Sequence, residues 1–309
     1  MKTIKIKEND VGIRIDKFIR KLYQNFSLSL IYKLLRTKKI KVNGKKIDID
    51  YKLQLNDTIE ILSFENLSNK NVLPNQPFLK SKNELKIAYE DDNLLIINKP
   101  KKLLVYDEKN EKFDTLINRA KKYLYKNNKW NYQDENQFEP SLLHRLDFNT
   151  DGLVMIAKNH KTLVDLNDEI KQRNVDKYYL CEVYGKMPEK EETLIAYWKK
   201  DLSKNIVYIN KEAKIGFDKI ITKYKVLSYD KKNDVSKLEV LLITGKTHQI
   251  RAHLSFIGHP ILGETKYIQK QFNKNNFFSS QQLTSYKIEF NIKNSEFLKY
   301  LNDKIITLK

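Results

Sequence analysis

The sequence predicts an α+β protein built from two domains, and three observations favour this class. Short apolar runs typical of strands alternate with segments whose apolar residues recur at helical spacing. A polar stretch over residues 63–84, which contains Pro74 and Pro77, has no such periodicity and reads as a linker. A chain of 309 residues is also long enough for one large domain or two. We therefore expect a domain over 1–62, a linker over 63–84 and a domain over 85–309.

The first domain contains the signals of two helices and a hairpin. Apolar residues recur at helical spacing over 13–22, and a second helical segment over 29–35 follows a serine-containing start that can cap it. Residues 40–47 alternate around an Asn-Gly pair, which is a strong signal for a two-residue hairpin turn. Residues 57–62 predict a further strand.

The charge of the chain indicates an anionic partner. The formal net charge is +19, and residues 1–62 carry 15 Lys and Arg against 7 Asp and Glu. This concentration favours a polyanion-binding surface, although lysine is also an ordinary solvated surface residue. Only 7 of the 58 basic residues are Arg, so the positions of the arginines are the more informative ones.

Composition also limits the compartment and the cofactors. We expect a soluble cytoplasmic protein, because no run of about 18 apolar residues and no signal-peptide core is present. A single cysteine, Cys181, fits a reducing compartment. The spacing of His248, His253 and His259 matches no familiar ligand pattern, so we expect no metal.

The second domain predicts strands interrupted by two helices. The helices are expected over 113–125 and 160–171, and a polar loop is expected over 126–139. Strands are expected over 87–89, 94–97, 153–158, 177–185 and 238–243.

Residues 143–158 form the most informative stretch of the chain. A turn-like cluster over 149–152 (Asn-Thr-Asp-Gly) separates two apolar runs, which places Asp147 at the lip of a buried strand. The ordinary alternative is that Asp147 closes a local turn through its own side chain and that His144 is a structural histidine.

This stretch and several others resemble one enzyme family. Residues 144–147 (His-Arg-Leu-Asp) followed by 150–153 (Thr-Asp-Gly-Leu) are similar to the signature of the RluA/RluC/RluD-type pseudouridine synthases. Similar blocks follow the family order at 98–100 (Asn-Lys-Pro), 177–185, 216–227 with Thr222 and Tyr224, 244–254 (Thr-Gly-Lys-Thr-His-Gln-Ile-Arg-Ala-His-Leu) and 258–263. The resemblance is closest to the branch that acts on large-subunit ribosomal RNA, and it covers about residues 12–62 and 86–290.

The sequence departs from the family pattern at five places. Asp151 stands where Ser or Thr is most frequent, and Lys101-Lys102 replace a turn of small residues. Lys246 and Glu264 replace the usual Arg and Asp with the charge kept. Thr284-Ser285 stand in place of His-Ala.

The resemblance implies both a fold and a chemistry. The implied catalytic domain has a central, mostly antiparallel mixed sheet flanked by helices and loops, and its reaction needs no cofactor. Asp147 is implied as the nucleophile that attacks a flipped-out uridine, Arg251 as the guanidinium that keeps it ionised, and Tyr179 as the aromatic face. The implied pocket walls are Leu254, His253 and Lys99. In the alternative, Arg251 only braces the strand and turn on which it lies.

Residues 14–57 resemble a second family, the small RNA-binding module of ribosomal protein S-four. The implied partner is RNA, and the module with its basic helix surfaces would contact the phosphate backbone. The candidate RNA-contacting residues are Arg14, Lys17, Lys33, Arg36, Lys38 and Lys45, together with Arg145 beside the nucleophile.

Two other functions remain open from the sequence. The chain could be a non-catalytic RNA-binding ribosome-assembly factor, which would keep the basic module without the chemistry. A glycoside hydrolase would need a second carboxylate near Asp147, for which Asp151 is the nearby candidate. We expect a monomer that acts on uridines of 23S ribosomal RNA and does not bind a membrane.

Overall fold

The computed structural model describes residues 1–23, 26–62, 76–107, 112–132, 138–268, 278 and 280–308. These residues form two compact units. The first comprises Met1–Glu84, Lys109–Ser141 and Ala157–Val164, and the second comprises Leu85–Glu108, Leu142–Ile156 and Asp165–Lys309. The domain limits expected at 62 and 85 stay a prediction.

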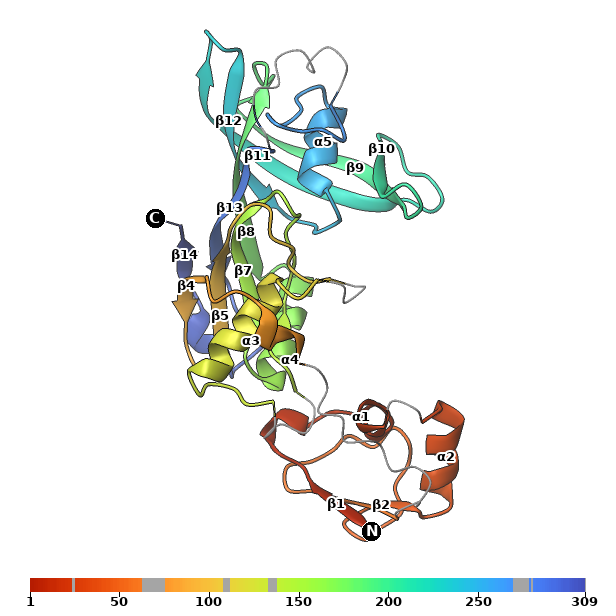
Figure 1. Ribbon diagram of the computed structural model, residues 1–309. Coiled ribbons are helices and arrows are strands. Elements are labelled where there is room, and N and C mark those ends of the chain that lie inside the picture. The colour runs from red at the N-terminus through yellow and green to blue at the C-terminus, as the bar shows by residue number, and fades with distance from the viewer. Residues whose placement is uncertain are drawn as a thin grey trace. The chain divides into compact units, whose positions relative to one another are not determined.

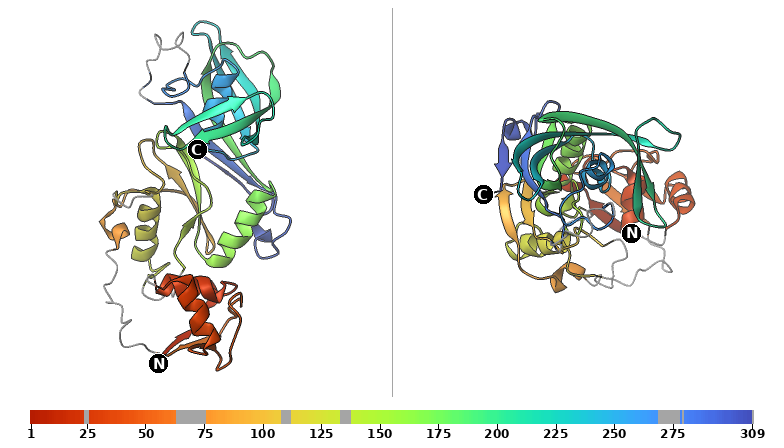
Figure 2. Two further views of the ribbon diagram at one scale, coloured as in Figure 1. Left: turned by 90° about the vertical axis from the view of Figure 1, so that its right-hand side faces the viewer. Right: turned by 90° about the horizontal axis from the view of Figure 1, so that it is seen from above.

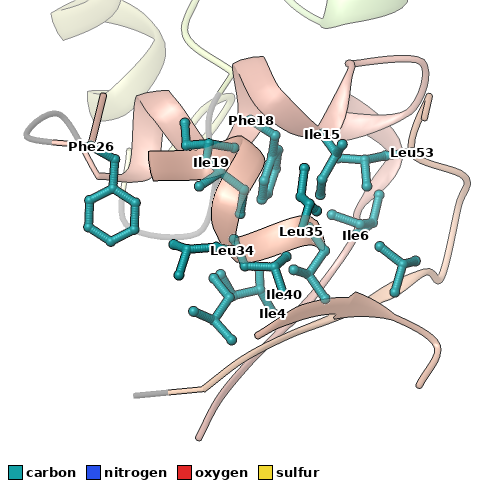
Figure 3. Packing of buried hydrophobic residues seen from close by; sticks show 14 residues of the cluster. Ile4, Ile6, Ile15, Phe18, Ile19, Phe26, Leu34, Leu35, Ile40 and Leu53 are labelled. Carbon is teal, nitrogen blue, oxygen red and sulfur yellow. The ribbon is translucent and has the colours of Figure 1, made fainter. Parts of the chain in front are cut away.

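The first unit begins with two helices on a three-stranded sheet (Figure 1). The helices are α1 (Ile15–Leu22) and α2 (Leu28–Arg36), and the strands are β1 (Lys2–Lys5), β2 (Ile40–Val42) and β3 (Thr58–Ile61), in the order β1-β3-β2. A short 3₁₀ helix, η1 (Glu8–Asp10), precedes α1. The apolar sides of both helices and of the sheet meet in one core, with Phe18, Ile19 and Leu35 among its buried members (Figure 3). Both predicted helices are confirmed.

The turns of this unit follow from its sequence. Ser27 caps α2, because its hydroxyl accepts a hydrogen bond from the Leu30 amide at 3.2 Å. Asn43 and Gly44 both have positive φ, as a tight hairpin turn requires, although the arm after the turn pairs only through a bridge between Val42 and Lys45. The strand that pairs with β2 over its whole length is β3.

The later part of the first unit has a core of its own. The 3₁₀ helix η3 (Pro77–Lys80) inserts Phe78, which is only 2% exposed, among Tyr125, Trp130 and Tyr132. Tyr125 belongs to α3 (Leu116–Lys126), which matches the helix predicted over 113–125. The end of the segment predicted as a linker therefore has a defined structure, because the buried side chain of Phe78 anchors it. Residues 63–75 of the same segment lie outside the described residues.

The second unit is built on an eleven-stranded sheet. Its main path runs β10-β9-β11-β12-β8-β13-β7-β5-β4, with β14 beside β13 and β6 beside β7. The bounds are β4 (Lys86–Glu90), β5 (Leu94–Lys99), β6 (Ser141–Leu142), β7 (Asp151–Ala157), β8 (Val175–Tyr184), β9 (Glu191–Asp201), β10 (Ile206–Asn210), β11 (Asp218–Asp230), β12 (Val235–Leu242), β13 (Leu283–Phe290) and β14 (Ile305–Thr307). Seven strand pairs of this sheet have a defined antiparallel register and one pair, β13 with β7, is parallel, so the expected mixed, mostly antiparallel sheet is confirmed.

Three helical segments accompany this sheet. They are α4 (His160–Lys171), as predicted, α5 (Gln249–Phe256) and the 3₁₀ helix η5 (Lys299–Leu301). Strands β9 to β12 curve around α5, which the two views of Figure 2 also show. The sequence did not predict β9, β10 or α5, and Arg251 lies on a helix instead of the strand and turn considered above. Within the described part of the chain, no helix is both long and apolar enough to span a membrane.

One glycine brings two distant segments of this unit together. Gly152, at the start of β7, pairs with Ser285 of β13 and has a φ of +114°. A Cβ atom at this position would lie 2.1 Å from the Ser285 carbonyl oxygen and 2.6 Å from its nitrogen. Only glycine allows β13 to approach β7 this closely beside the turn that holds Asp147.

Replacing this glycine tests the close approach. We expect Gly152→Ala to lower the free energy of unfolding by several kcal/mol, because backbone strain adds to a clash with backbone atoms that cannot rotate away. Gly258→Ala is the matched control: its φ is +91°, but a Cβ there meets nothing within 4 Å, so only strain of about 1–3 kcal/mol is expected. Equal losses in urea unfolding would contradict this account.

Candidate active site

Asp147 lies in the turn between β6 and β7, at one side of a pocket. The Thr150 amide donates to the Asp147 carbonyl at 3.1 Å, and Gln281 Nε2 donates to Thr150 Oγ1 at 2.6 Å, so the turn is fixed from within and from the segment before β13. This confirms the predicted place of Asp147 at the lip of a buried strand. The pocket is lined by Arg145, Leu146, Asp147, Thr150, Tyr179, Leu242, Lys246, His248, Gln249, Ile250, Arg251 and Leu283.

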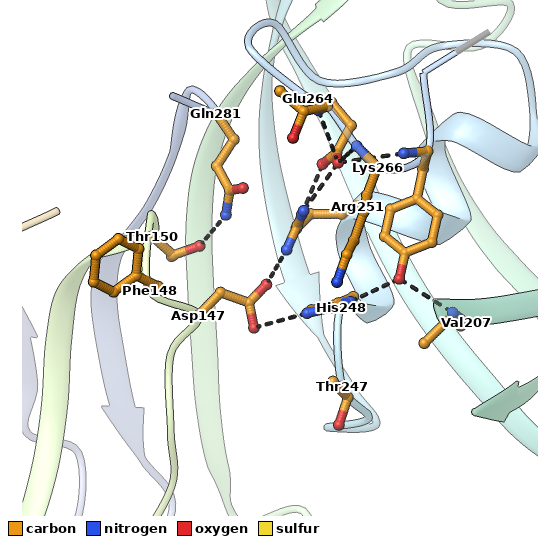
Figure 4. Close-up of polar contacts among 12 residues, drawn as sticks. Asp147, Phe148, Thr150, Val207, Thr247, His248, Arg251, Glu264, Lys266 and Gln281 are labelled. Atoms are coloured by element: carbon orange, nitrogen blue, oxygen red, sulfur yellow. Dashed lines mark hydrogen bonds and ion pairs between the residues drawn. The ribbon is translucent and has the colours of Figure 1, made fainter. Parts of the chain in front are cut away.

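Helix α5 presents Arg251 to this pocket. The amide of Gln249 fixes the start of the helix: its Nε2 donates to the Ile221 carbonyl at 3.0 Å and to Thr222 Oγ1 at 2.9 Å on β11. Two residues further on, Arg251 Nη1 donates to Asp147 Oδ2 at 2.7 Å (Figure 4). The two side chains implied for catalysis thus form a charged hydrogen bond across the pocket, with exposed fractions of 9% and 20%.

The other edge of the Arg251 guanidinium is held by Glu264. Nε and Nη2 donate to the two Glu264 carboxylate oxygens at 2.7 and 2.9 Å. The amides of Lys266 and Thr265 also donate to Oε1, at 2.8 and 3.1 Å. Burial alone would raise the pKa of Glu264, but its bonds to Arg251 and to backbone amides hold the pKa below its ordinary value. A fully buried carboxylate therefore remains charged and fixes the plane of the guanidinium.

His248 faces the second oxygen of Asp147. Its Nε2 lies 3.8 Å from Asp147 Oδ1, and its Nδ1 lies 2.6 Å from the Tyr267 hydroxyl. That hydroxyl also accepts from the Val207 amide at 3.2 Å. Burial lowers the pKa of His248 to about 4. His248 is therefore a neutral imidazole whose Nε2 edge faces the carboxylate.

Tyr179 and Arg145 complete the pocket on two sides. Tyr179 is 4% exposed, and burial raises the pKa of its hydroxyl, so the phenol is neutral. Its ring forms a wall of the pocket. Arg145 is exposed at the rim, where its guanidinium lies over the Tyr106 ring, 5.1 Å from the centroid, and donates to the Tyr106 hydroxyl at 2.6 Å.

Three residues implied as pocket walls lie outside the pocket lining, and this expectation needs correction. On α5, His253 follows Arg251 by two positions and so lies on the opposite side of the helix, and neither His253 nor Leu254 lines the pocket. His253 Nδ1 bonds to Thr222 Oγ1 at 3.0 Å beneath the sheet, and Leu254 is wholly buried. Lys99 is also wholly buried, beneath the turn that bears Asp147.

Most candidate RNA-contacting side chains of the first unit are exposed to solvent. Lys17 on α1 and the set Lys33, Arg36, Lys38 and Lys45 on and after α2 are exposed. Arg14 differs, because its Nε and Nη2 donate to both oxygens of Asp16 at 3.1 and 3.0 Å. The roles of these side chains in binding RNA stay a prediction.

Sequence reasoning missed the supporting residues of the pocket. His248 was weighed only as a metal ligand, and Tyr267, Gln249 and Gln281 received no role. Their signal was their position inside or beside the matched blocks, yet their contacts join segments far apart in the chain. In the part of the chain that the structure describes, no three His, Cys, Asp or Glu side chains are gathered so as to hold a metal ion.

Comparison with known proteins agrees with this geometry. The family model of RNA pseudouridylate synthases matches residues 93–256, and the S4 domain model matches residues 13–59. The chain belongs to the RNA pseudouridylate synthase family and carries an N-terminal S4 domain. It is therefore an isomerase.

Individual relatives extend over nearly the whole chain. An uncharacterized RNA pseudouridine synthase of Mycoplasma capricolum subsp. capricolum is 33% identical over 97% of this chain and 95% of its own length. Ribosomal large subunit pseudouridine synthase C of Rickettsia prowazekii is 32% identical over 92% of this chain and 94% of its own. The structure of human RNA pseudouridylate synthase domain containing 4 aligns with a TM-score of 0.55 at 19% identity, over 72% of this chain and 88% of that one, which shows the shared fold.

The buried histidines make the fold sensitive to acid. Burial lowers the pKa of His144 to about 3 and the pKa values of His248 and His253 to about 4. In the unfolded chain these groups take up protons near pH 6.5, so between pH 6.5 and 4 the unfolded state binds more protons and stability falls as the pH falls. We expect a loss on the order of 2 kcal/mol for each histidine at pH 5, measured by urea unfolding. His144→Gln should flatten this dependence; a stability that is constant from pH 7 to pH 5 would contradict it.

The simultaneous contacts of Arg251 with Glu264 and Asp147 can be tested by replacing the arginine with lysine. A single ammonium cannot reach both Glu264 and Asp147 in the geometry of the guanidinium, so one buried charge loses its partner. We expect Arg251→Lys to lower the free energy of unfolding by at least about 2 kcal/mol. Arg20→Lys, on the exposed side of α1, is the matched control and should change stability by less than about 0.5 kcal/mol. If both variants unfold at the same urea concentration, Arg251 does not carry the network.

Proposed function

We propose that this enzyme isomerises specific uridines of large-subunit ribosomal RNA to pseudouridine, with the carboxylate of Asp147 as the nucleophile. The observation that carries the proposal is the charged contact of 2.7 Å between Asp147 and an arginine that Glu264 fixes in a pocket. The names of the relatives that act on the large ribosomal subunit support the choice of RNA.

The pocket suits an ionised nucleophile. The guanidinium of Arg251 places a positive charge beside the Asp147 carboxylate. One oxygen of Asp147 accepts from Arg251 Nη1 at 2.7 Å, and the other lies 3.8 Å from His248 Nε2. The carboxylate is thus oriented, and 20% of its side chain stays exposed toward an incoming nucleotide.

The reaction moves one bond and one proton. The bond from uracil N1 to the sugar breaks while the carboxylate attacks or stabilises the developing cation, the base turns, and carbon 5 forms the new bond to the sugar. Carbon 5 loses its proton and N1 gains one, so atoms and electrons balance without a redox partner. The charge that develops at the sugar requires the carboxylate to be ionised from the start.

The target uridine must leave the RNA stack to reach Asp147. We infer that it lies against the ring of Tyr179, because stacking on an aromatic face is worth about 1–3 kcal/mol and offsets part of the cost of flipping. Arg145 at the rim then contacts a flanking phosphate or fills the space that the base leaves. The S4 domain, with Lys17, Lys33, Arg36, Lys38 and Lys45 exposed, supplies the binding to the RNA backbone that does not depend on sequence.

Removing the charge of Asp147 tests the nucleophile. We expect Asp147→Asn to lower the rate of pseudouridine formation by at least about a thousandfold, because an amide is neither nucleophilic nor charged. The measurement is modification mapping of large-subunit ribosomal RNA transcribed without modifications and incubated with the purified protein. Asp92→Asn, which removes an exposed carboxylate from the turn between β4 and β5, is the matched control.

Three outcomes distinguish the alternatives. A variant that forms pseudouridine as fast as the parent contradicts the role of Asp147. A parent protein that binds ribosomal RNA tightly but modifies no uridine favours the non-catalytic assembly factor. A parent that modifies RNA from another source and leaves large-subunit RNA unmodified keeps the chemistry and overturns the substrate.

A further inference from the structure

Lys99 is a wholly buried lysine whose ammonium donates to three backbone carbonyls. It ends β5, and its Nζ donates to the carbonyls of Pro100 and Leu103 at 2.9 Å each and to that of Phe148 at 3.2 Å. An ammonium group has three N–H bonds, so these contacts use its full donor set. The third carbonyl belongs to the residue after Asp147. Lys99 therefore fastens the backbone beside the nucleophile to the turn that follows β5.

The carbonyls around Lys99 are neutral, so its charge must be balanced from further away. Asp151 begins β7, the strand beside β5 in the sheet, and lies three residues after Phe148, whose carbonyl the ammonium contacts at 3.2 Å. The carboxylate of Asp151 and, more weakly, that of Asp147 favour the positive charge of Lys99. Asp151 is in turn fixed by Thr284 of β13, whose Oγ1 donates to Asp151 Oδ1 at 2.9 Å where the parallel strands β7 and β13 pair. Both residues are departures from the family pattern, and the structure shows that they contact one another.

We propose that Asp151 is a positioning residue, whose carboxylate keeps the buried ammonium of Lys99 protonated so that it can hold the backbone that bears Asp147. This proposal rests on the proposed function only where the measured quantity is synthase activity. It assigns to Asp151 a role through Lys99, in place of a second acid or base that acts on the substrate.

The balance between burial and charge makes this arrangement sensitive to pH. Burial lowers the pKa of Lys99 to about 8, and Asp151 and Asp147 oppose the decrease. Lys99 is protonated below that pH. When it gives its proton to solvent hydroxide, two N–H bonds remain for three carbonyls. The longest contact, to Phe148, is the one we expect to open, which frees the turn that holds Asp147.

The charged groups that face Lys99 limit the alternatives. Its other neighbours from the turn after β5 and from the Asp147 turn contribute carbonyl oxygens, so the two carboxylates are the groups whose removal changes its charge state. Asp147 cannot be replaced without removing the nucleophile. Asp151 is therefore the position at which the effect on Lys99 can be isolated.

The first test compares the pH dependence of kcat between pH 6 and pH 9 in the parent, Asp151→Asn and Asp151→Ser, the last carrying a residue frequent in the family. We expect the alkaline limb of both variants to move to lower pH by on the order of one unit, because one opposing charge is lost. For Asp151→Asn, kcat should then be about fivefold below the parent at pH 8 and within about a tenth of it at pH 6. Asp92→Asn removes an exposed carboxylate and should follow the parent at every pH. Titration of the RNA substrate is the same for all four proteins, so it cannot produce a difference between them.

The second test measures Lys99 directly and does not need activity. In protein labelled with ¹⁵N at lysine Nζ, the Lys99 resonance is the one that disappears in Lys99→Arg, and its titration midpoint should move to lower pH in Asp151→Asn. An unchanged midpoint overturns the proposal. So do superimposable kcat profiles of parent and variant, and so does a loss of kcat by the same factor at every pH, which would mean that Asp151 acts elsewhere. A parent without synthase activity but with the expected shift of the midpoint would refute the proposed function alone.

Discussion

The structure of the second unit depends on one guanidinium that must satisfy two carboxylates at once. Arg251 gives two N–H bonds to the wholly buried Glu264 and one to Asp147 at the pocket. Removal of Arg251 leaves two carboxylates without their cation, and removal of either carboxylate leaves N–H groups of the guanidinium without their acceptor. The network therefore explains why helix α5, the turn after it and the loop of Asp147 have to meet, and the same contacts that position the Asp147 carboxylate also require the fold to close around it.

The elements around this network are held by contacts that leave little freedom. Gly152 lets β13 lie against β7, Gln281 holds Thr150, and Thr284 holds Asp151, so the segment before and within β13 fixes the Asp147 turn at three successive residues. Lys99 fixes the same turn from below. Contacts from two neighbouring strands thus hold the turn that bears Asp147 in one geometry, as the precise placement of a reactive side chain requires.

The sequence predicted the chemistry better than the geometry around it. Asp147 and Arg251 lie 104 positions apart, and only the resemblance of two blocks linked them before the structure showed their bond. Helix α5 escaped prediction because nearly all of it is buried, so it has no alternation of apolar and polar faces. Strand β9 was missed because charged residues occupy both of its ends, and β10, a run of only five residues, received no prediction. The departures at Asp151 and Thr284 looked unrelated, since no spacing in the sequence shows that two strands pair there.

Arginine use in this chain follows the same physical logic. Lysine is the ordinary cation here, and only 7 of 58 basic residues are Arg. Three of the seven make forked pairs with one carboxylate: Arg14 with Asp16, Arg119 with Asp114, and Arg251 with Glu264. A fourth, Arg145, lies over an aromatic ring, 5.1 Å from its centroid. Each of the three forked pairs needs a planar cation with several donors, which an ammonium cannot provide. At these three positions, replacement by lysine should therefore disturb the structure even though the charge is kept, whereas Lys99 occupies a site that needs three diverging donors and a proton that can be lost.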